Sequence, residues 1–311
     1  MLSRVANSLY WMARYLERAD NVARFIDVNS HLTLDLALPD DSQQWHPLIS
    51  ASGDDEDFYS RYKAADERSV VRFLTFDAQN PNSILSSIYR ARENARTVRE
   101  VIPVEMWEKI NALYHLTQAH SRKRSVADLQ DYYKEVRQSG HLLTGLMYNT
   151  MSREQGWQFA HIGQMLERAD KTARLLDVKY FLLSPRHHAA DTAYDAVQWG
   201  AVLKSVHALE MYRQQYHSIN YRDVTAFLLF SHAFPRSVLF CLHEAARDLD
   251  ALDHAATTPN RARAEMAILI RTIETSSASH IIASGLHEFI DLVQANLNLV
   301  DEAVELSFFK T

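Results

Sequence analysis

An internal repeat constrains this 311-residue chain more than any other feature of its sequence. Residues 16–20, Leu-Glu-Arg-Ala-Asp, return 150 positions later as residues 166–170. Farther along, similar residues recur at an offset of 154, as Trp45 and Trp199 do. A tandem duplication on this scale predicts a fold made of two similar halves, because each copy should form the same elements.

Glycine and proline are both scarce, with 7 of each in the chain, which predicts long helices joined by short connections. No segment alternates apolar and polar residues as a half-buried strand would, so we expect essentially no sheet. The sequence therefore predicts an all-α helical bundle of about ten to twelve helices. Its two tandem pseudo-symmetric halves, residues 1–150 and 151–311, are expected to pack as one domain.

Helical periodicity is clearest at the start of each half, where apolar residues recur at steps of three and four. The stripe of the first helix is Val5, Leu9, Met12, Leu16, Ala19, Ala23 and Ile26, and that of its copy is Phe159, Ile162, Leu166, Ala169, Ala173 and Leu176. Further helices are predicted at about 65–78 and 221–232, after Pro81 and Pro235 with proline in the first turn, and as closing helices at about 125–149 and 277–308.

Charged residues follow one flank of both stripes, and we name them the charged ladders. The ladders consist of Glu17, Asp20, Arg24 and Asp27 in the first copy and of Glu167, Asp170, Arg174 and Asp177 in the second. One interpretation is local pairing, Asp20 with Arg24 and Asp170 with Arg174, four residues apart. Another is that the ladders meet across a pseudo-twofold axis and fix how the halves align. A ligand or partner site is the third.

A second stripe on the first helix is rich in arginine and amide side chains. It consists of Arg4, Asn7, Trp11, Arg14, Arg18 and Asn21, and we name it the arginine stripe. Arginine beside an aromatic ring is typical of protein interfaces and anion sites, because the planar guanidinium binds carboxylate or phosphate through two hydrogen bonds. In the second copy His161 replaces Trp11 and Gln164 replaces Arg14, so a function of this face would have diverged between the halves.

A further group of charges, Arg92, Glu93, Asn94 and Arg96, is not reproduced in the second half. This group fits either a salt-bridged surface helix or a charged pocket shared with the first helix.

The single cysteine, Cys241, stands in an apolar run and is predicted to be a small buried hydrophobe. One cysteine permits no disulfide within the chain, which fits a reducing cytoplasm.

Metal and cofactor sites are not expected. A helical di-iron centre needs Glu-x-x-His on two helices, and this chain has no such step. His243 and Glu244 begin a zinc-protease motif, but Arg247 stands where the second histidine must be. His280 and His287 are expected to share a helix face two turns apart, too far to bind one ion from that helix alone.

Net charge and hydropathy exclude two classes of partner. The formal net charge of −6 argues against nucleic acid, whose phosphates need a basic face. The longest apolar runs fall far short of the ~20 residues that a membrane span requires. We therefore expect neither nucleic acid nor membrane as a partner.

The repeated helix resembles the alpha-E family, a bacterial all-helical family of unknown function. The resemblance rests on residues 3–15 (Ser-Arg-Val-Ala-Asn-Ser-Leu-Tyr-Trp-Met-Ala-Arg-Tyr), 81–85, 92–96 and 234–238, and it extends over essentially the whole chain. It implies that the protein acts beside, or fused to, a circularly permuted ATP-grasp protein of the carboxylate–amine ligase type. A transglutaminase-like cysteine peptidase often accompanies such members. The resemblance supplies no catalytic residue that could be assigned to this chain.

Three functions follow as hypotheses. The first is a non-catalytic partner or adaptor that contacts the ATP-grasp ligase through the arginine stripe, in synthesis or processing of a peptide or amide-linked product. The second is an enzyme whose charged pocket transfers an acyl or amide group to an amine; a scaffold for two partners is the third. The predicted partner or ligand site comprises Arg4, Asn7, Trp11, Arg14, Glu17, Arg18, Asp20, Arg24, Arg92, Glu93, Asn94 and Arg96, with Glu167, Arg168, Asp170 and Arg174 as repeat counterparts.

Overall fold

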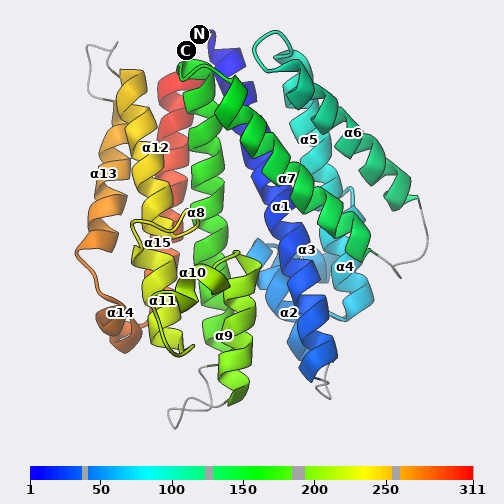
Figure 1. Ribbon diagram of the computed structural model, residues 1–311, viewed down its shortest axis with the longest axis vertical. Coiled ribbons are helices and arrows are strands. Elements are labelled where there is room, and N and C mark those ends of the chain that lie inside the picture. Colours follow the sequence, from blue (N-terminus) through cyan, green and yellow to red (C-terminus); the bar gives the residue numbers. More distant parts are fainter. Residues whose placement is uncertain (37–40, 123–128, 184–192, 254–259, 311) are drawn as a thin grey trace.

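Every regular element in the described part of the chain is a helix, as predicted (Figure 1). The structure is a computed structural model that describes residues 1–36, 41–122, 129–183, 193–253 and 260–310. Fifteen α-helices lie within these residues, against the ten to twelve expected. The expected number was too low because the shortest helices have too few turns to produce a period in the sequence.

The helices follow one another in this order. The first half contains α1 (Ser3–Leu36), α2 (Asp41–Ser52), α3 (Asp55–Arg61), α4 (Glu67–Phe76), α5 (Ile84–Thr97), α6 (Val104–Ser121) and α7 (Gln130–Thr150). The second half contains α8 (Gln155–Leu183), α9 (Ala193–Ser205), α10 (Leu209–Arg213), α11 (Tyr221–Phe230), α12 (Val238–Asp253), α13 (Arg261–Glu274), α14 (Ala278–Ser284) and α15 (Leu286–Val304), followed by the π-helical turn η1 (Glu305–Phe309).

The long helices α1 and α8 pack against each other at the centre and begin at the same end of the molecule (Figure 1). Every member of the two predicted apolar stripes is buried except Val5, which is half-buried. The close approach of the helices depends on Gly163 of α8, because a Cβ atom built there would lie 2.4 Å from the carbonyl oxygen of Tyr10. The residue at the matching position of α1 is also small, Ala13.

Both halves contribute to one continuous cluster of buried apolar side chains. Each long helix carries a helix of its own half, α5 on α1 and α12 on α8. The shorter helices cross over, since α2 packs more extensively on α8 than on α1, and α9 more extensively on α1 than on α8. Buried Trp45 of α2 and Trp199 of α9 anchor these crossings. The halves therefore interlock rather than lie beside each other as separate lobes.

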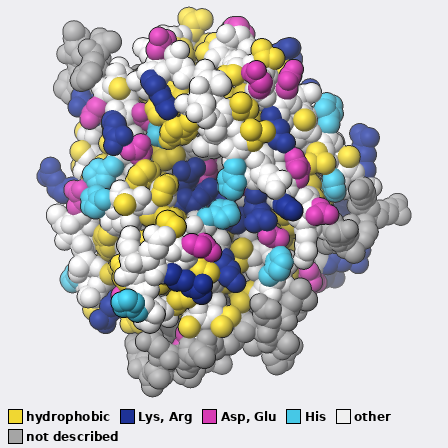
Figure 2. Space-filling model, in the orientation of Figure 1, with side chains coloured by type: hydrophobic (Ala, Val, Ile, Leu, Met, Phe, Trp, Pro, Cys, Tyr) yellow, Lys and Arg dark blue, Asp and Glu magenta, His cyan; other side chains and the backbone are white. Residues whose placement is uncertain are grey.

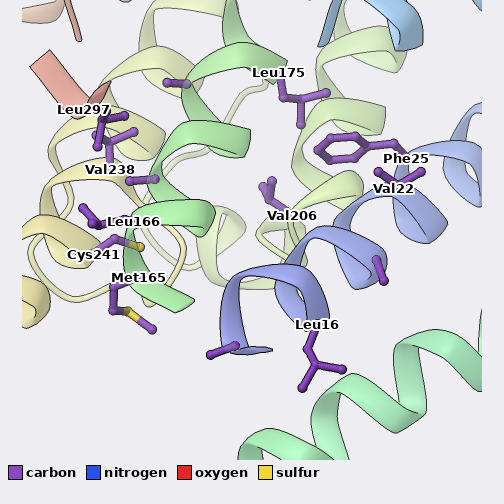
Figure 3. Close-up of a cluster of buried hydrophobic side chains, with 14 of the residues drawn as sticks. Leu16, Val22, Phe25, Met165, Leu166, Leu175, Val206, Val238, Cys241 and Leu297 are labelled. Atoms are coloured by element: carbon purple, nitrogen blue, oxygen red, sulfur yellow. The ribbon is translucent and has the colours of Figure 1, made fainter. Parts of the chain in front are cut away.

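Figure 3 shows part of this cluster, with Leu16 and Val22 of α1, Leu166 of α8 and Cys241 of α12 among its members. Cys241 is fully buried, as predicted, and burial raises the pKa of its thiol to about 12. The thiol is therefore protonated and packs as a small apolar side chain.

The sequence predicted several helix positions well and misplaced two starts. The helices expected near 65–78 and 221–232 are α4 and α11. Proline does not open the following helices; Ser83 and Ser237 cap them instead, each accepting a hydrogen bond from a backbone N–H three residues later, at 3.1 Å and 3.2 Å. The repeated Pro-x-Ser segment is thus a turn that ends in an N-cap serine.

The closing helix expected at 277–308 is divided into α14 and α15 at Gly285. This glycine has φ +122°, and a Cβ there would collide with the Glu288 carboxylate. His280 and His287 consequently lie on different helices, not on one face as expected. Of the other closing helix, residues 125–128 lie outside the described part, and α7 begins at Gln130. Within the described residues no helix combines the length and apolarity needed to cross a membrane.

Candidate functional site

The repeat places a glutamate directly before an arginine in each long helix, and these two Glu–Arg dipeptides meet where α1 contacts α8. Arg18 donates from Nε to Oε1 of Glu167 at 2.6 Å and from Nη2 to Oε2 at 2.8 Å. Arg168 donates in the same way to Glu17, from Nε to Oε1 at 3.0 Å and from Nη2 to Oε2 at 2.8 Å. Two parallel hydrogen bonds make each pair a strong and directional contact. Each half thus supplies the carboxylate for the other half's arginine.

These reciprocal pairs lie inside the molecule. The side chains of Glu17 and Glu167 are 3% and 0% exposed. Burial alone would raise the pKa of both carboxyls, but the charges of Arg168 at Glu17 and of Arg18 at Glu167 outweigh it. Both pKa values therefore lie well below the ordinary 4.5, and both groups are ionised at neutral pH.

Acid is expected to unfold the protein through these carboxyls. A folded-state pKa below the unfolded value means that the contribution to stability is complete above the unfolded pKa and is lost as pH falls toward the folded pKa. We expect the melting temperature to decline steeply below about pH 4.5. The doubly substituted Glu17→Gln, Glu167→Gln protein should be less stable at pH 7 and show a flatter decline, measured by circular dichroism. A wild-type curve that stays level down to about pH 2 would contradict this account.

The surroundings of the two pairs differ between the halves. Glu17 also accepts from Arg236 Nη1 at 2.8 Å and from Gln164 Nε2 at 3.2 Å. Glu167 accepts from Arg14 Nε at 3.1 Å instead. Arg236 lies in the loop before α12, where the repeat has Asn82 in the first half, and Asn82 accepts from Arg18 at 2.8 Å. The pairs are common to both halves, whereas the second arginine differs: at Glu17 it comes from the loop before α12, and at Glu167 it comes from α1.

A cavity of about 420 Å³ adjoins the Glu17 side of this arrangement. Its lining comes from α1, α6, α7, α8 and the loops at residues 206–207 and 234–236. The polar members of the lining are Glu17, Asp20, His141, Thr144, Gln164, Arg168, His207 and Arg236. On the face drawn in Figure 2, basic side chains and histidines gather around a hollow near the centre. We name this space the Glu17 cavity.

Two buried acceptors in the Glu17 cavity lack a hydrogen-bond partner among the described residues. They are Oδ1 of Asp20 and Oε1 of Gln164, in residues that are 3% and 6% exposed. The other Asp20 oxygen accepts from Arg236 Nη2 at 3.1 Å and from Arg24. A buried acceptor without a donor costs free energy, which a hydrogen-bond donor that reached these two atoms would recover.

Two exposed histidines, His141 and His207, stand at the rim of the cavity with ring centroids 5.4 Å apart. Partial loss of water around the ring, reinforced by the charges of Arg24 and Arg236, lowers the pKa of His207 to about 4. The same loss of water lowers the pKa of His141. Both rings are therefore neutral at pH 7. His207 has φ +54°, a left-handed conformation that costs a residue with a side chain on the order of 1 kcal/mol.

The local pairs predicted within the charged ladders are confirmed. Asp20 pairs with Arg24, which is fully buried, and Arg174 Nε lies 2.9 Å from Asp170 Oδ1. The two charged ladders also meet, because Glu17 of the first pairs with Arg168 and Glu167 of the second pairs with Arg18. These contacts hold the two halves in alignment. Asp20 reaches the cavity as well, which makes part of the first ladder available to a ligand.

The arginine stripe, predicted to contact a partner or an anion, lies largely against the second half of the chain. The side chains of Arg14 and Arg18 are 11% and 12% exposed and are engaged with the second half, and Asn21 is buried. Trp11 is half-buried, with the Arg14 guanidinium 5.1 Å from its ring. Of the stripe, Arg4 alone is exposed. The residues that Arg14 and Arg18 contact lie about half a chain or more away in sequence, so the sequence could not identify them.

The charges at 92–96 form a surface network and not a pocket shared with α1. Arg92 donates to Asn111 at 2.8 Å and to Glu93 at 2.9 Å, and Arg96 donates to Glu93 at 2.9 Å. Neither these residues nor the half-buried Asn94 line the Glu17 cavity. The salt-bridged surface helix is therefore the correct alternative for this segment.

A second polar arrangement, which the sequence did not suggest, lies beside the cavity. His161 of α8 is bonded through Nδ1 to Asp248 at 2.5 Å and through Nε2 to the hydroxyl of Tyr148 at 2.6 Å. Arg236 and the two rim histidines were missed as well. The one usable signal was divergence between the copies, because His161 and Arg236 stand where the first half has Trp11 and Asn82.

Fold and site together define an all-helical domain whose two longest helices exchange buried Glu–Arg pairs. The chain belongs to the Alpha-E family, described as a predicted alpha-helical domain with a conserved ER motif, and the family model matches residues 1–309. Glu17-Arg18 and Glu167-Arg168 are Glu–Arg steps of the kind that this description names.

Similar curated proteins come from mycobacteria and are titled as uncharacterized. One from Mycobacterium bovis and two from strains of Mycobacterium tuberculosis are each 27% identical to this chain over 304 residues, which is 91% of the chain. The chain spans only 34% of the length of these relatives. No solved structure matches it.

Proposed function

We propose that this chain is a non-catalytic binding partner of an ATP-grasp carboxylate–amine ligase and holds that enzyme's amino-acid or short-peptide substrate or product in the Glu17 cavity. The observation that carries the proposal is the pair of unpartnered acceptors, Asp20 Oδ1 and Gln164 Oε1, among the described residues of one lining. Such acceptors need N–H donors, which an ammonium or amide group provides. Arg236 in the same lining donates to Glu17 and Asp20, so a ligand carboxylate would share this guanidinium with them.

The size of the cavity supports a small ligand. A volume of about 420 Å³ lies at the lower end of the range of small-molecule sites, roughly 300–1,000 Å³. An amino acid or dipeptide fits this space. The chain carries opposite charges at the cavity, which suits a molecule with an ammonium and a carboxylate group.

Two observations support a protein partner. The mycobacterial relatives are about three times as long as the matched region, so in them the domain is joined to other segments. Since Arg14 and Arg18 of the arginine stripe are engaged with the second half, we propose that the contact uses another face. Exposed Leu292, Leu299 and Leu306 lie seven residues apart from α15 into η1, a spacing on which a partner helix can pack. We place the ligase contact there.

The duplication fits this division of roles. The Glu–Arg pairs common to both copies hold two pseudo-symmetric halves together. Gln164 and Arg236, which differ from their counterparts in the first half, bind the ligand. Partnership with an ATP-dependent ligase places the chain in the cytoplasm, where the lone thiol of Cys241 stays reduced.

Ligand binding is tested by titration calorimetry with single amino acids, dipeptides and their N-acetylated forms. We expect dissociation constants in the micromolar to millimolar range, and N-acetylation should weaken binding because it removes the ammonium group. Gln164→Leu and Arg236→Ala should each weaken binding at least about tenfold, a loss of about 1.4 kcal/mol. Arg96→Ala, on the surface network, is the matched control and should bind as the wild type does. Equal losses in Arg96→Ala, or no binding by any ligand, would refute the cavity as the site.

The partner is tested by mixing the chain with the ATP-grasp ligase encoded beside it. Co-elution in size-exclusion chromatography is expected, together with a change in ligase activity. Leu299→Glu should abolish the complex but leave ligand binding intact. If the chain binds the ligand but forms no complex with the ligase, it is a ligand-binding protein and the proposed partnership is disproved.

A second candidate function is acyl or amide transfer, favoured by the Tyr148–His161–Asp248 arrangement. The carboxylate orients the imidazole, which can accept the proton of the hydroxyl, as in an activated nucleophile. Turnover of an ester or amide that disappears in Tyr148→Phe, with the fold unchanged, would replace the non-catalytic proposal.

A further inference from the structure

A second cavity, of about 960 Å³, lies on the other side of the charged ladders, between residues 46–60, α8 and α15. Carboxylates dominate its lining: Asp54, Asp55, Glu56, Asp57, Asp177 and Asp291. The lining contains one arginine, Arg174, which donates to Asp170 at 2.9 Å. In this lining, which we name the acidic cavity, the carboxylate side chains therefore greatly outnumber the arginines.

Three possible metal ligands converge within the acidic cavity. Asp177 comes from α8, and His287 and Asp291 come from one face of α15, four residues apart. One donor atom from each lies within 4.8 Å of the others. His287 Nδ1 is 2.9 Å from Asp177 Oδ1, and His287 Nε2 is 3.4 Å from Asp291 Oδ2. The sequence separates these residues by more than 100 positions, so their spacing could not reveal the group.

A separate observation also points to a cation here. Asp54 is 7% exposed and lines the same cavity, and its Oδ2 has no hydrogen-bond partner among the described residues. Its other oxygen accepts from Asn82 Nδ2 at 2.7 Å. Gly53 precedes it with φ +81°, a backbone conformation that residues with a side chain rarely adopt, so the turn before Asp54 favours glycine. A buried carboxylate oxygen without a donor is costly unless a positive charge compensates it.

We propose that Asp177, His287 and Asp291 bind one divalent transition-metal ion in the acidic cavity. The donor set of one imidazole and two carboxylates suits Zn²⁺ or Mn²⁺ better than Mg²⁺ or Ca²⁺, which prefer oxygen alone. The ion binds one ring nitrogen of His287 and one carboxylate oxygen from each aspartate, and the other ring nitrogen stays free of it. It joins α15 to α8 and offsets the negative charge of the lining. The site is distinct from the Glu17 cavity and does not depend on the proposed function.

Metal binding should compete with protonation of His287. The ring must lose its proton to bind a metal. Affinity should therefore fall as pH is lowered through the pKa of His287, with Arg174 and His46 as the other basic groups in the lining.

The test uses the whole chain after dialysis against a chelator. Zn²⁺, Mn²⁺, Mg²⁺ and Ca²⁺ are titrated separately by calorimetry, and the melting temperature is measured with and without each ion. We expect one Zn²⁺ per chain, a higher melting temperature with Zn²⁺, and little effect of Mg²⁺ or Ca²⁺. His287→Ala and Asp177→Asn should each weaken Zn²⁺ binding at least about a hundredfold, and Asp291→Asn about tenfold.

His243→Ala provides the matched control, because His243 lies in a comparably exposed pair with Glu274 at 3.0 Å that no third ligand joins within the described residues. It should bind Zn²⁺ as the wild type does. Visible absorption of bound Co²⁺, present in the wild type and absent in His287→Ala, reports coordination even if a variant is less stable. A Zn²⁺ affinity weaker than about 0.1 mM, or one unchanged in His287→Ala, would show only a His–carboxylate contact between two helices.

Discussion

Replacing Glu167 with alanine is expected to lower the free energy of unfolding by about 3–5 kcal/mol, the cost of removing one partner from a buried ion pair. Glu167 is fully buried and accepts hydrogen bonds from Arg18 and Arg14. Without it, the Arg18 guanidinium stays inside the protein with no carboxylate. Glu17→Ala should be at least as damaging, because Arg168 and Arg236 both donate to Glu17.

Urea denaturation at pH 7 measures the effect, with Glu135→Ala as the control. Glu135 pairs with Lys109 at 2.8 Å at the surface, where such a pair contributes about 0–1 kcal/mol. The doubly substituted Glu167→Ala, Arg18→Ala protein should be more stable than the sum of the single losses predicts, because no uncompensated charge remains. If Glu167→Ala and Glu135→Ala cost the same, the reciprocal pairs do not hold the halves together.

Gly163→Ala is expected to be the most damaging addition of a single methyl group, costing about 1–3 kcal/mol or more. The new Cβ would meet the Tyr10 carbonyl oxygen at 2.4 Å and the carbonyl carbon at 3.1 Å, and both atoms belong to the backbone of α1. The helices must move apart, since no side chain can rotate away. That shift also disturbs Glu167, one turn along α8, so packing and charge pairing suffer together.

Gly145→Ala is the matched control, because this glycine also lies within a long helix, α7, but a Cβ there meets no atom within 4 Å. Alanine is favoured over glycine in a helix by about 1 kcal/mol, so this variant should be more stable than the wild type. Opposite signs for the two substitutions, measured as urea midpoints, are the expected result. Destabilisation of both would indicate that helix-specific strain, and not the contact between α1 and α8, decides the outcome.

The fold could be predicted largely from local patterns. The apolar stripes, the Asp–Arg pairs within each long helix and the family were all correct, because period, spacing and motif lie within short segments. The helix count was too low, since α3 and α10 are too short for a period and Gly285 divides one expected helix. Proline was assigned to a first turn that serine in fact caps.

The candidate site was predicted only in part, for a physical reason. A charged helix face indicates solvent unless its partners are known, and the partners of Arg18 and Arg14 lie on α8 and α15. Asp20 and Glu17 were named correctly as residues of a charged site. Arg236, in a loop, carried no periodic signal, and no motif linked Asp177 to His287. Such groupings depend on how the halves interlock, which residue spacing does not encode.

The reciprocal Glu–Arg pairs have the form of an isologous dimer interface, in which residue i of one subunit meets j of the other and j meets i. Here one polypeptide supplies both surfaces, and only residues 151–154 separate α7 from α8. Covalent linkage holds the two surfaces at an effective concentration on the order of millimolar or above, however dilute the protein is. Two separate subunits would dissociate on dilution, whereas the contact between the two halves does not depend on how much protein is present. Because each half always meets the same partner half, the two copies can also diverge in sequence.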